Sequence, residues 1–371
     1  MQLICQTQAL VEAVSNVQRA VSGKTTIPAL EGILFQTSGD KVSLTGYDLE
    51  LGISTNIQAQ VQREGRIVLP AKMLGDLVRK LPGDEVSLTV DNKGNTVIVS
   101  DATEFTIMGI DAADYPEMPA VNDGVGLTLP QNLLRSMIRQ TLFAVAQTNV
   151  RPIQTGVLFL LKDCLLQLVA VDGQRLAMRS EKVESTGEMN FVVPGKTLSE
   201  VLKLLEDEDS SMTMAVGRRH IVMEIGGYAV ISRLLDGEFI PYQRAIPQNI
   251  TTTVRVNTRS FIDSVDRAAL VTNDRLKAPL VCTFSDNKVR VYCSTPLGRV
   301  NDALSATIEG KEEEMGFNSR FLLDALRNTE ADEVRVELAG ALQPMKILPV
   351  SGDNFLFLVL PVRLPNHNRN V

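Results

Sequence analysis

The sequence predicts an α+β protein in which one unit of about 124 residues occurs three times. Residues 7–14, 130–138 and 258–265 each place apolar side chains three or four positions apart, as one buried helix face requires. Landmarks then recur at a spacing of 124 positions, namely Gly32 and Gly156, and Pro70, Pro194 and Asn318. Because solenoid repeats have only about 20–50 residues, each unit is expected to be a domain with its own core.

Each unit follows the same order of elements. The first helix precedes two β-type segments, which are 32–35 with 41–45, 156–159 with 166–169, and 280–284 with 288–292. A second helix then follows Pro70, Pro194 or Asn318, and further strands close the unit. This order predicts two helices packed on antiparallel sheet. Turn signals at 122–124 and 247–249 predict domains at 1–125, 126–250 and 251–371.

The composition excludes a disordered protein, a collagen-like protein and a disulfide-rich scaffold. With 44% hydrophobic and 22% charged residues, the chain is typical of a globular protein. It has no apolar run of about 18 residues and no secretion leader pattern at the N-terminus, so we expect a cytoplasmic protein. The four cysteines, Cys5, Cys164, Cys282 and Cys293, are far apart, and we expect them to be buried and reduced.

Enzyme motifs are missing. Gly23-Lys24-Thr25 and Gly195-Lys196-Thr197 resemble the end of a phosphate-binding loop, but the position that such a loop needs as glycine holds Gln18 or Asn190. The chain has only two histidines, which leaves little material for a metal site or a catalytic triad. The acidic run 207–209 is expected to be a solvated turn after a helix ending near Leu205. We therefore expect no catalysis, no cofactor and no metal.

The charge is unevenly distributed along the chain. The net charge is −7, which argues against a simple basic nucleic-acid binder. All the segments that contain predicted helices nevertheless carry net positive charge, namely 8–24, 71–80, 131–151, 195–205, 258–277 and 318–328. One explanation is that basic residues near helix ends favour the helix dipole. The functional explanation is a basic helical surface facing a polyanion, with an acidic surface elsewhere.

Five motifs, taken with the threefold repeat, identify a resemblance over the full chain. They are LTGYDLE at 44–50, VDGQRLA at 171–177, DGEF at 236–239 followed by Tyr242, GFN at 316–318 and LPVRL at 360–364. Together they resemble the bacterial replicative DNA polymerase sliding clamps, the beta clamp family. The resemblance implies three clamp domains per chain and a head-to-tail homodimer that forms a ring around duplex DNA. It also implies a non-catalytic processivity factor that tethers the replicative polymerase and is opened by an ATP-driven clamp loader.

The resemblance also implies site residues. Duplex contacts are expected at Lys24, Arg79, Thr148 and Lys196, and the dimer interface at Phe105, Ile107, Leu270 and Val271. A pocket for linear motifs of polymerases, the loader and repair proteins is expected between the second and third domains. Its residues are Arg151, Ile153, Gly156, Val171, Gly173, Gln174, Arg175, Leu176, Pro241, Arg244, Asn318, Phe321, Leu342, Pro344, Leu360, Pro361, Val362, Arg363 and Leu364.

The pocket is expected to combine an apolar surface with two positively charged side chains. Val171, Leu176, Leu360 and Val362 would receive Leu or Phe side chains, and Arg175 and Arg363 would bind carbonyls or acids. An alternative is that Val171 and Leu176 are ordinary core residues and that Arg363 is a solvated terminal charge.

The sequence departs from the family pattern in three places. Gln174 stands where the family often has His, and Ile153 where it often has an aromatic residue. Seven residues, 365–371, follow the Arg-Leu pair at which the family commonly stops. The alternative function is a stand-alone peptide-binding hub that does not encircle DNA, which would be a monomer.

Overall fold

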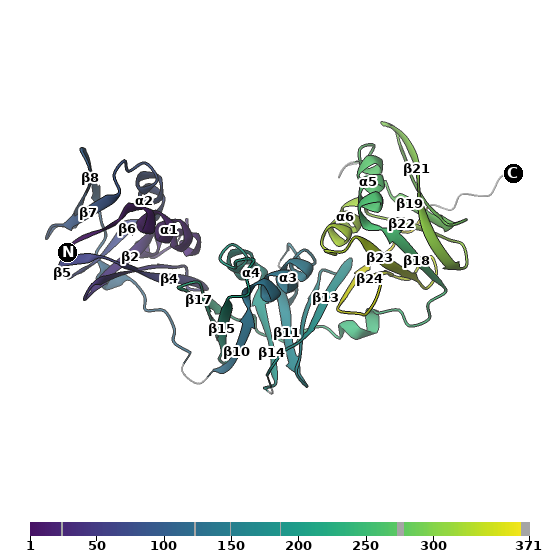
Figure 1. The fold of residues 1–371 in the computed structure, drawn as a ribbon, viewed down its shortest axis with the longest axis horizontal. Coiled ribbons are helices and arrows are strands. Elements are labelled where there is room, and N and C mark those ends of the chain that lie inside the picture. The colour runs from purple at the N-terminus through teal and green to yellow at the C-terminus, as the bar shows by residue number, and fades with distance from the viewer. Residues whose placement is uncertain (24, 122–123, 149, 186, 273–277, 365–371) are drawn as a thin grey trace. The chain divides into compact units, whose positions relative to one another are not determined.

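The structure is a computed structural model that describes residues 1–23, 25–121, 124–148, 150–185, 187–272 and 278–364. Its elements, which are labelled in Figure 1, divide into two compact units, residues 1–135 with 196–234, and residues 136–195 with 235–371. Helices α3 (Gln131–Leu142) and α4 (Gly195–Val201) each contribute residues to both units. The domain boundaries at 125 and 250 remain a prediction.

The first unit contains two antiparallel sheets. The five-stranded sheet has the order β5-β1-β7-β8-β9 and consists of β1 (Gln2–Gln6), β5 (Gln60–Arg63), β7 (Glu85–Val90), β8 (Asn95–Ser100) and β9 (Thr103–Met108). The eight-stranded sheet has the order β10-β15-β16-β17-β4-β3-β2-β6 and consists of β2 (Gly32–Ser38), β3 (Lys41–Tyr47), β4 (Leu51–Gln58), β6 (Arg66–Pro70), β10 (Val125–Pro130), β15 (Ser211–Val216), β16 (His220–Ile225) and β17 (Tyr228–Arg233). The strands of the first repeat are thus divided between two sheets.

Strands of the first and second repeats join directly in this unit. β17 pairs with β4 from Tyr228 opposite Thr55 to Ser232 opposite Leu51. The sequence predicts strands on both sides of this junction but not the continuous sheet, because strand pairing between repeats leaves no periodic signal in either repeat alone.

The two helices of the first repeat pack together in the first unit. α1 (Thr7–Val17) buries Leu10, Val14 and Val17 and lies against β3 and β4. α2 (Ala71–Val78) approaches the end of α1 at Gly75, where a Cβ atom would lie only 2.2 Å from Oε1 of Gln18. Glycine at this position leaves space for the Gln18 side-chain amide.

The second unit contains one twelve-stranded antiparallel sheet with the order β14-β11-β12-β13-β25-β24-β23-β18-β21-β20-β19-β22. The strands are β11 (Gly156–Lys162), β12 (Leu165–Val171), β13 (Arg175–Lys182), β14 (Met189–Pro194), β18 (Thr252–Asn257), β19 (Leu280–Ser285), β20 (Lys288–Thr295), β21 (Gly298–Gly310), β22 (Glu313–Phe317), β23 (Glu333–Leu338), β24 (Met345–Pro349) and β25 (Phe355–Val359). Here β13 of the second repeat pairs with β25 of the third, from Arg175 opposite Val359 to Arg179 opposite Phe355.

The helices of the third repeat, α5 (Thr258–Ala269) and α6 (Ser319–Arg327), pack together and begin at asparagine caps. Oδ1 of Asn257 accepts the Ser260 N–H at 2.9 Å, and Oδ1 of Asn318 accepts the Arg320 N–H at 3.0 Å. Such caps satisfy N–H groups that have no partner within the helix. The first and second helix predicted in each repeat are confirmed. None of the described helices is both long and apolar enough to cross a membrane.

The cysteines follow the expectation at three positions. Cys5, Cys282 and Cys293 are buried and free, but Cys164 is exposed, so the expectation of a buried thiol is wrong there. Cys164 and Asp163 form the turn between β11 and β12 with φ angles of 59° and 52°. A two-residue turn at the end of a hairpin points into solvent, which explains the exposure of this thiol.

Candidate functional site

The turn between β12 and β13 is the centre of the predicted pocket, and all the predicted pocket residues belong to the second unit. Oδ1 of Asp172 accepts the N–H groups of Gln174 at 2.9 Å and Arg175 at 3.0 Å, while Gly173 has a φ of 88°. A carboxylate that binds the backbone two and three residues on, followed by glycine, fixes a tight turn. The Leu360 N–H donates to the Gln174 carbonyl at 2.9 Å, so the C-terminal segment lies along this turn.

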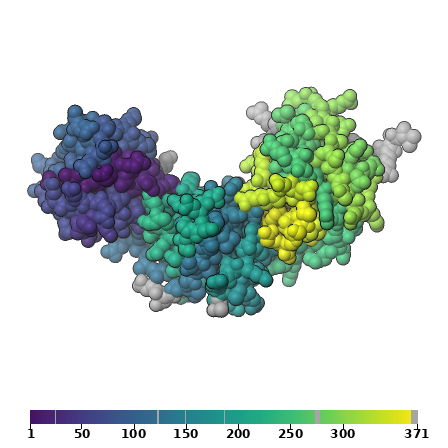
Figure 2. Space-filling view, viewed as in Figure 1, coloured from purple at the N-terminus to yellow at the C-terminus, as the bar shows by residue number. Residues whose placement is uncertain are grey.

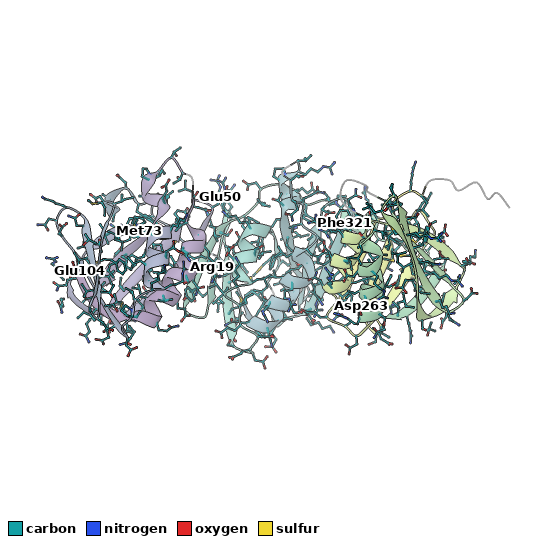
Figure 3. All side chains as sticks on the ribbon, turned by 90° about the horizontal axis from the view of Figure 1, so that it is seen from above. Arg19, Glu50, Met73, Glu104, Asp263 and Phe321 are labelled. Carbon is teal, nitrogen blue, oxygen red and sulfur yellow. The ribbon has the colours of Figure 1, made fainter. Side chains whose placement is uncertain are left out.

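The Arg175 side chain is only 5% exposed and is held from several sides. Its Nε lies 2.9 Å from Oδ2 of Asp172, and its Nη1 lies 2.5 Å from Oδ2 of Asp324 on α6. The guanidinium carbon is 4.8 Å from the ring centre of Phe321, which Figure 3 shows on α6, and 5.6 Å from that of Phe143. The charge is thus compensated, and a ligand carbonyl or acid would have to displace Asp324 to reach it.

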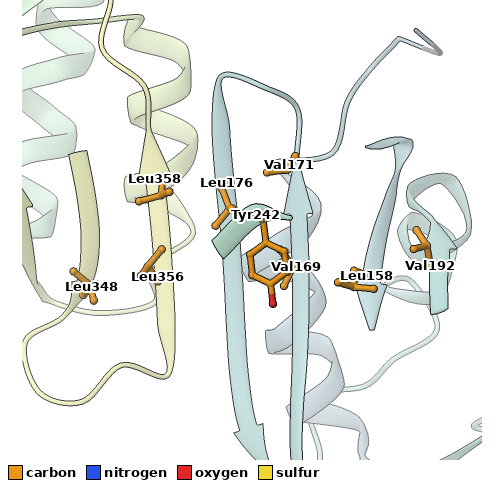
Figure 4. Packing of buried hydrophobic residues seen from close by; sticks show 9 residues of the cluster. All are labelled: Leu158, Val169, Val171, Leu176, Val192, Tyr242, Leu348, Leu356 and Leu358. Carbon is orange, nitrogen blue, oxygen red and sulfur yellow. The ribbon is translucent and has the colours of Figure 1, made fainter. Parts of the chain in front are cut away.

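Val171 and Leu176 belong to a buried cluster (Figure 4). They are 5% and 1% exposed and pack with residues of β25, the strand that pairs with β13, and with Tyr242. In this structure both side chains are part of the buried core and do not line an open apolar pocket. Among the predicted pocket residues, the exposed apolar side chains are Leu342, at 73%, and Val362, at 39%.

The C-terminal segment is fixed at Gly316. The Val362 N–H donates to the Gly316 carbonyl at 2.8 Å. A Cβ atom on Gly316 would lie 2.7 Å from a methyl group of Leu364 and 2.8 Å from the Val362 carbonyl oxygen. The glycine of the GFN motif therefore leaves space for the C-terminal residues Val362 and Leu364. Figure 2 shows in yellow part of the surface formed by the last described stretch of the chain.

The remaining pocket residues differ widely in exposure. The exposed ones are Arg151, Gly173, Gln174, Pro241, Arg244, Asn318 and Arg363. The half-buried ones are Ile153, Phe321, Pro344, Leu360, Pro361 and Leu364, and Gly156 is buried.

Sequence reasoning missed three residues of this site, Asp172, Asp324 and Phe143. Asp172 stands within the VDGQRLA motif, and Asp324 lies one helical turn after Phe321, so a signal existed for both. The sequence predicts Arg175 as a pocket residue, but not its pairing with Asp324, because the two residues are 149 positions apart and their contact depends on the tertiary fold.

Three of the four residues expected to contact duplex DNA are described: two form ion pairs and one is exposed to solvent. Lys24 lies outside the described residues. Nζ of Lys196 lies 2.7 Å from Oδ2 of Asp48, and Arg79 lies 2.8 Å from Asp76. Thr148 is exposed. Both partners of the Arg79–Asp76 pair are exposed, and such a pair contributes about 0–1 kcal/mol, so a phosphate group can replace Asp76 at little cost. In the other pair Lys196 is exposed, but the Asp48 side chain is only 11% exposed.

The positive charge of the helices is weaker than the segment totals indicate. α3 ends at Leu142, so Arg151 does not lie on it. Many of the other cations have acidic partners, in the pairs Arg135–Asp207, Arg139–Glu330, Arg259–Asp263, Arg267–Asp302 and Arg327–Asp266. Within the described part of the chain, Lys72, Lys80 and Arg320 are exposed without an ion partner.

Two strands present an edge that no other described strand occupies. β9 is the last strand of the five-stranded sheet. In β21, residues 298–305 pair with β20, whereas only residues 306–310 pair with β18. Of the predicted interface residues, Leu270 is 81% exposed, Phe105 and Val271 are half-buried, and Ile107 is buried.

The acidic turn at 207–209 is exposed, as the sequence predicts. Asp207 pairs with Arg135, and Asp209 accepts a hydrogen bond from Asn132 at 2.6 Å. No cluster of potential metal ligands occurs among the residues that the structure describes.

Comparison with known families gives three consecutive matches along the chain. Residues 1–119, 128–241 and 243–363 match the models of the N-terminal, central and C-terminal domains of the DNA polymerase III beta subunit. The beta sliding clamp of Bacillus subtilis strain 168 is 34% identical over 376 residues, which cover 98% of this chain and 100% of the relative. That of Halalkalibacterium halodurans is 32% identical, with the same coverage.

Solved structures agree with these matches. The crystal structure of the DNA polymerase sliding clamp from Bacillus subtilis is similar with a TM-score of 0.96 at 34% identity, covering 98% of this chain and 100% of that one. A sliding clamp from Pseudomonas aeruginosa bound to griselimycin gives a TM-score of 0.93 at 27% identity, with the same coverage.

Proposed function

The chain belongs to the DNA polymerase III beta subunit family, and from this membership we propose that it is a DNA sliding clamp that tethers the replicative polymerase to duplex DNA. Two chains would close head to tail into a ring around the duplex. The observation that carries the proposal is the uninterrupted order of all three family domains, matched over nearly the whole chain and over the whole length of its relatives.

A ring explains how an acidic protein can act on DNA. Retention on the duplex is then topological and needs little affinity, whereas tight base contacts would prevent sliding. Lys24, Arg79, Thr148 and Lys196 would make weak contacts to phosphates that depend on salt and not on sequence. The pairing of Lys196 with Asp48 and of Arg79 with Asp76 supports this, since an exchangeable partner keeps each contact weak.

Ring closure would join the open edge of β9 in one chain to the open edge of β21 in the other. Free strand edges readily accept another strand, and two unlike ends on one chain permit a closed head-to-tail dimer. Leu270 supports this assignment, because a leucine 81% exposed in one chain would be buried in the dimer beside Val271, Phe105 and Ile107.

Partner proteins would bind at the pocket around the β12–β13 turn and the C-terminal segment. We propose that polymerases, the clamp loader and repair proteins insert short linear motifs there, and that the protein does so in the cytoplasm. The exposed side chains of Leu342 and Val362 would take up apolar anchors, and Arg363 and Arg244 would bind acidic or carbonyl groups.

Sedimentation equilibrium of the full chain tests the assembly. A mass twice that of one chain is expected at micromolar concentration. A monomer would instead favour the alternative, a peptide-binding hub that does not encircle DNA.

A further inference from the structure

Arg218 and Arg219 form a basic cluster with His220 at the turn that joins β15 to β16. Both arginines are exposed, and neither side chain has an ion pair with any residue that the structure describes. Many of the other arginines are paired with an acid. Arg218 and Arg219 therefore place two positive charges without an ion partner next to each other in an acidic chain.

His220 and Arg233, beside this turn, lie on the sheet face opposite to helix α4. The hydroxyl groups of Thr197, on α4, and Ser232, on β17, lie 2.7 Å apart, so Ser232 points to the helix side. Successive side chains of a strand alternate between faces. Arg233, which follows Ser232, therefore points to the other face, and His220 is its direct cross-strand neighbour.

Arg219 and Arg233 both affect the titration of His220. The Arg219 carbonyl accepts the Leu234 N–H at 2.8 Å, which fixes the turn beside the end of β17. Burial, followed by the positive charges of Arg233 and Arg219, lowers the pKa of His220. The pKa of His220 thus responds to Arg219, a residue of the turn, in addition to its strand neighbour Arg233.

We propose that Arg218 and Arg219 dock a short acidic segment of a partner protein at the turn beside His220. Two adjacent guanidinium groups can bind two carboxylates through charge-assisted, bidentate hydrogen bonds. Lys196, one of the residues proposed to contact DNA, belongs to α4, which lies on the side of this sheet opposite to His220.

The extent of the cluster favours a short peptide over a nucleic acid. Glu224 is exposed on the same face as His220, four residues along β16, and exposed Glu50, labelled in Figure 3, precedes β4 and accepts the Arg233 N–H through its carbonyl at 2.8 Å. A polyanion long enough for several phosphate contacts would run onto these carboxylates. A segment with two or three acidic side chains would not.

The test measures binding of a fluorescent peptide of about six glutamates to the full chain by anisotropy at about 50 mM salt, where exposed charges are weakly screened. Wild type should bind saturably. The double variant Arg218→Glu with Arg219→Glu should bind at least about tenfold more weakly, since two attractive contacts become repulsive. The matched control, Lys41→Glu with Arg66→Glu, changes two exposed cations of the same unit by the same charge and should lose less than about twofold.

Three results would overturn the proposal. The first is the absence of saturable binding to wild type, and the second is an equal loss in both double variants, which would indicate a general charge effect. The third is a single-stranded oligonucleotide that displaces the peptide and binds more tightly than it, with its own affinity dependent on Arg218 and Arg219. That outcome would assign the cluster to nucleic acid.

Discussion

The Asp324 carboxylate on α6 lies 2.5 Å from the guanidinium of Arg175, the first residue of β13. Through this ion pair a helix of the third repeat holds the turn around which the pocket of the second repeat is built. Asp172 binds the same guanidinium at 2.9 Å, so one buried cation serves two carboxylates. The pair therefore fixes the relation between the two halves of the site.

Removing Arg175 should destabilise the protein strongly. Arg175→Ala removes a buried guanidinium that packs on Phe321 and pairs with two partly exposed carboxylates, of which Asp172 keeps its backbone N–H partners, so a cost of about 2–3 kcal/mol is expected. Asp324→Asn keeps a hydrogen-bond acceptor and should cost about 1–2 kcal/mol. Urea denaturation measures both changes. As a control, Asp286→Asn removes an exposed pair with Arg290 and should change stability by less than about 0.5 kcal/mol. Equal effects for Arg175→Ala and the control would contradict this role.

A methyl group at Gly316 should impair the pocket more than the fold. In Gly316→Ala the new Cβ meets the Val362 carbonyl oxygen and Leu364, so the C-terminal segment must move. Affinity for a peptide of the Gln-Leu-x-Leu-Phe type, measured by isothermal titration, should fall about tenfold, because a displaced wall loses its apolar contacts. Gly126→Ala is the control, since no atom lies within 4 Å of its Cβ position. Unchanged affinity in Gly316→Ala would place the partner site elsewhere.

Replacing Leu270 and Val271 together with alanine should produce monomers, because interfaces depend on a few apolar anchors that become buried. Sedimentation velocity measures the change. Leu342→Ala, which truncates another exposed leucine of the same unit, should leave the dimer intact. An undiminished dimer in the double variant would show that the interface assignment is wrong.

Releasing Lys196 from Asp48 should strengthen contact with duplex DNA. Asp48→Asn removes the charge but keeps the Oδ1 that accepts the N–H groups of Glu50 and Leu51, so the turn should persist. We expect affinity for duplex to rise about twofold to fivefold, and Lys196→Gln to lower it and reduce the salt dependence by about one phosphate contact. Binding titrations over a range of salt concentrations measure both. If neither variant changes the affinity, Lys196 does not face the duplex.

The sequence predicts the repeat and its helices well, because both depend on local periodicity. The spacing of Leu10, Val14 and Val17 is enough to mark the buried face of α1. The pairing of β13 with β25 and of β17 with β4 could not be predicted, since it depends on which strand edges meet across repeats.

For the site too, the sequence predicts what depends on local motifs and not what depends on the tertiary fold. The motifs around Arg175 and Gly316 mark the correct region, but sequence alone assigns Arg175 to a ligand, whereas the fold gives it Asp172 and Asp324 as partners. Likewise the charge totals of the helical segments miss the acids that fold back onto them, such as Glu330 onto Arg139.

The central claim is that the protein holds DNA by encircling it. The most direct measurement loads the protein, with a clamp loader and ATP, onto a nicked circular duplex, cuts the circle once and follows the fraction retained by gel filtration. Encirclement predicts stable retention on the circle and release within minutes from the linear product at the same salt concentration. Equal retention on both forms would contradict it.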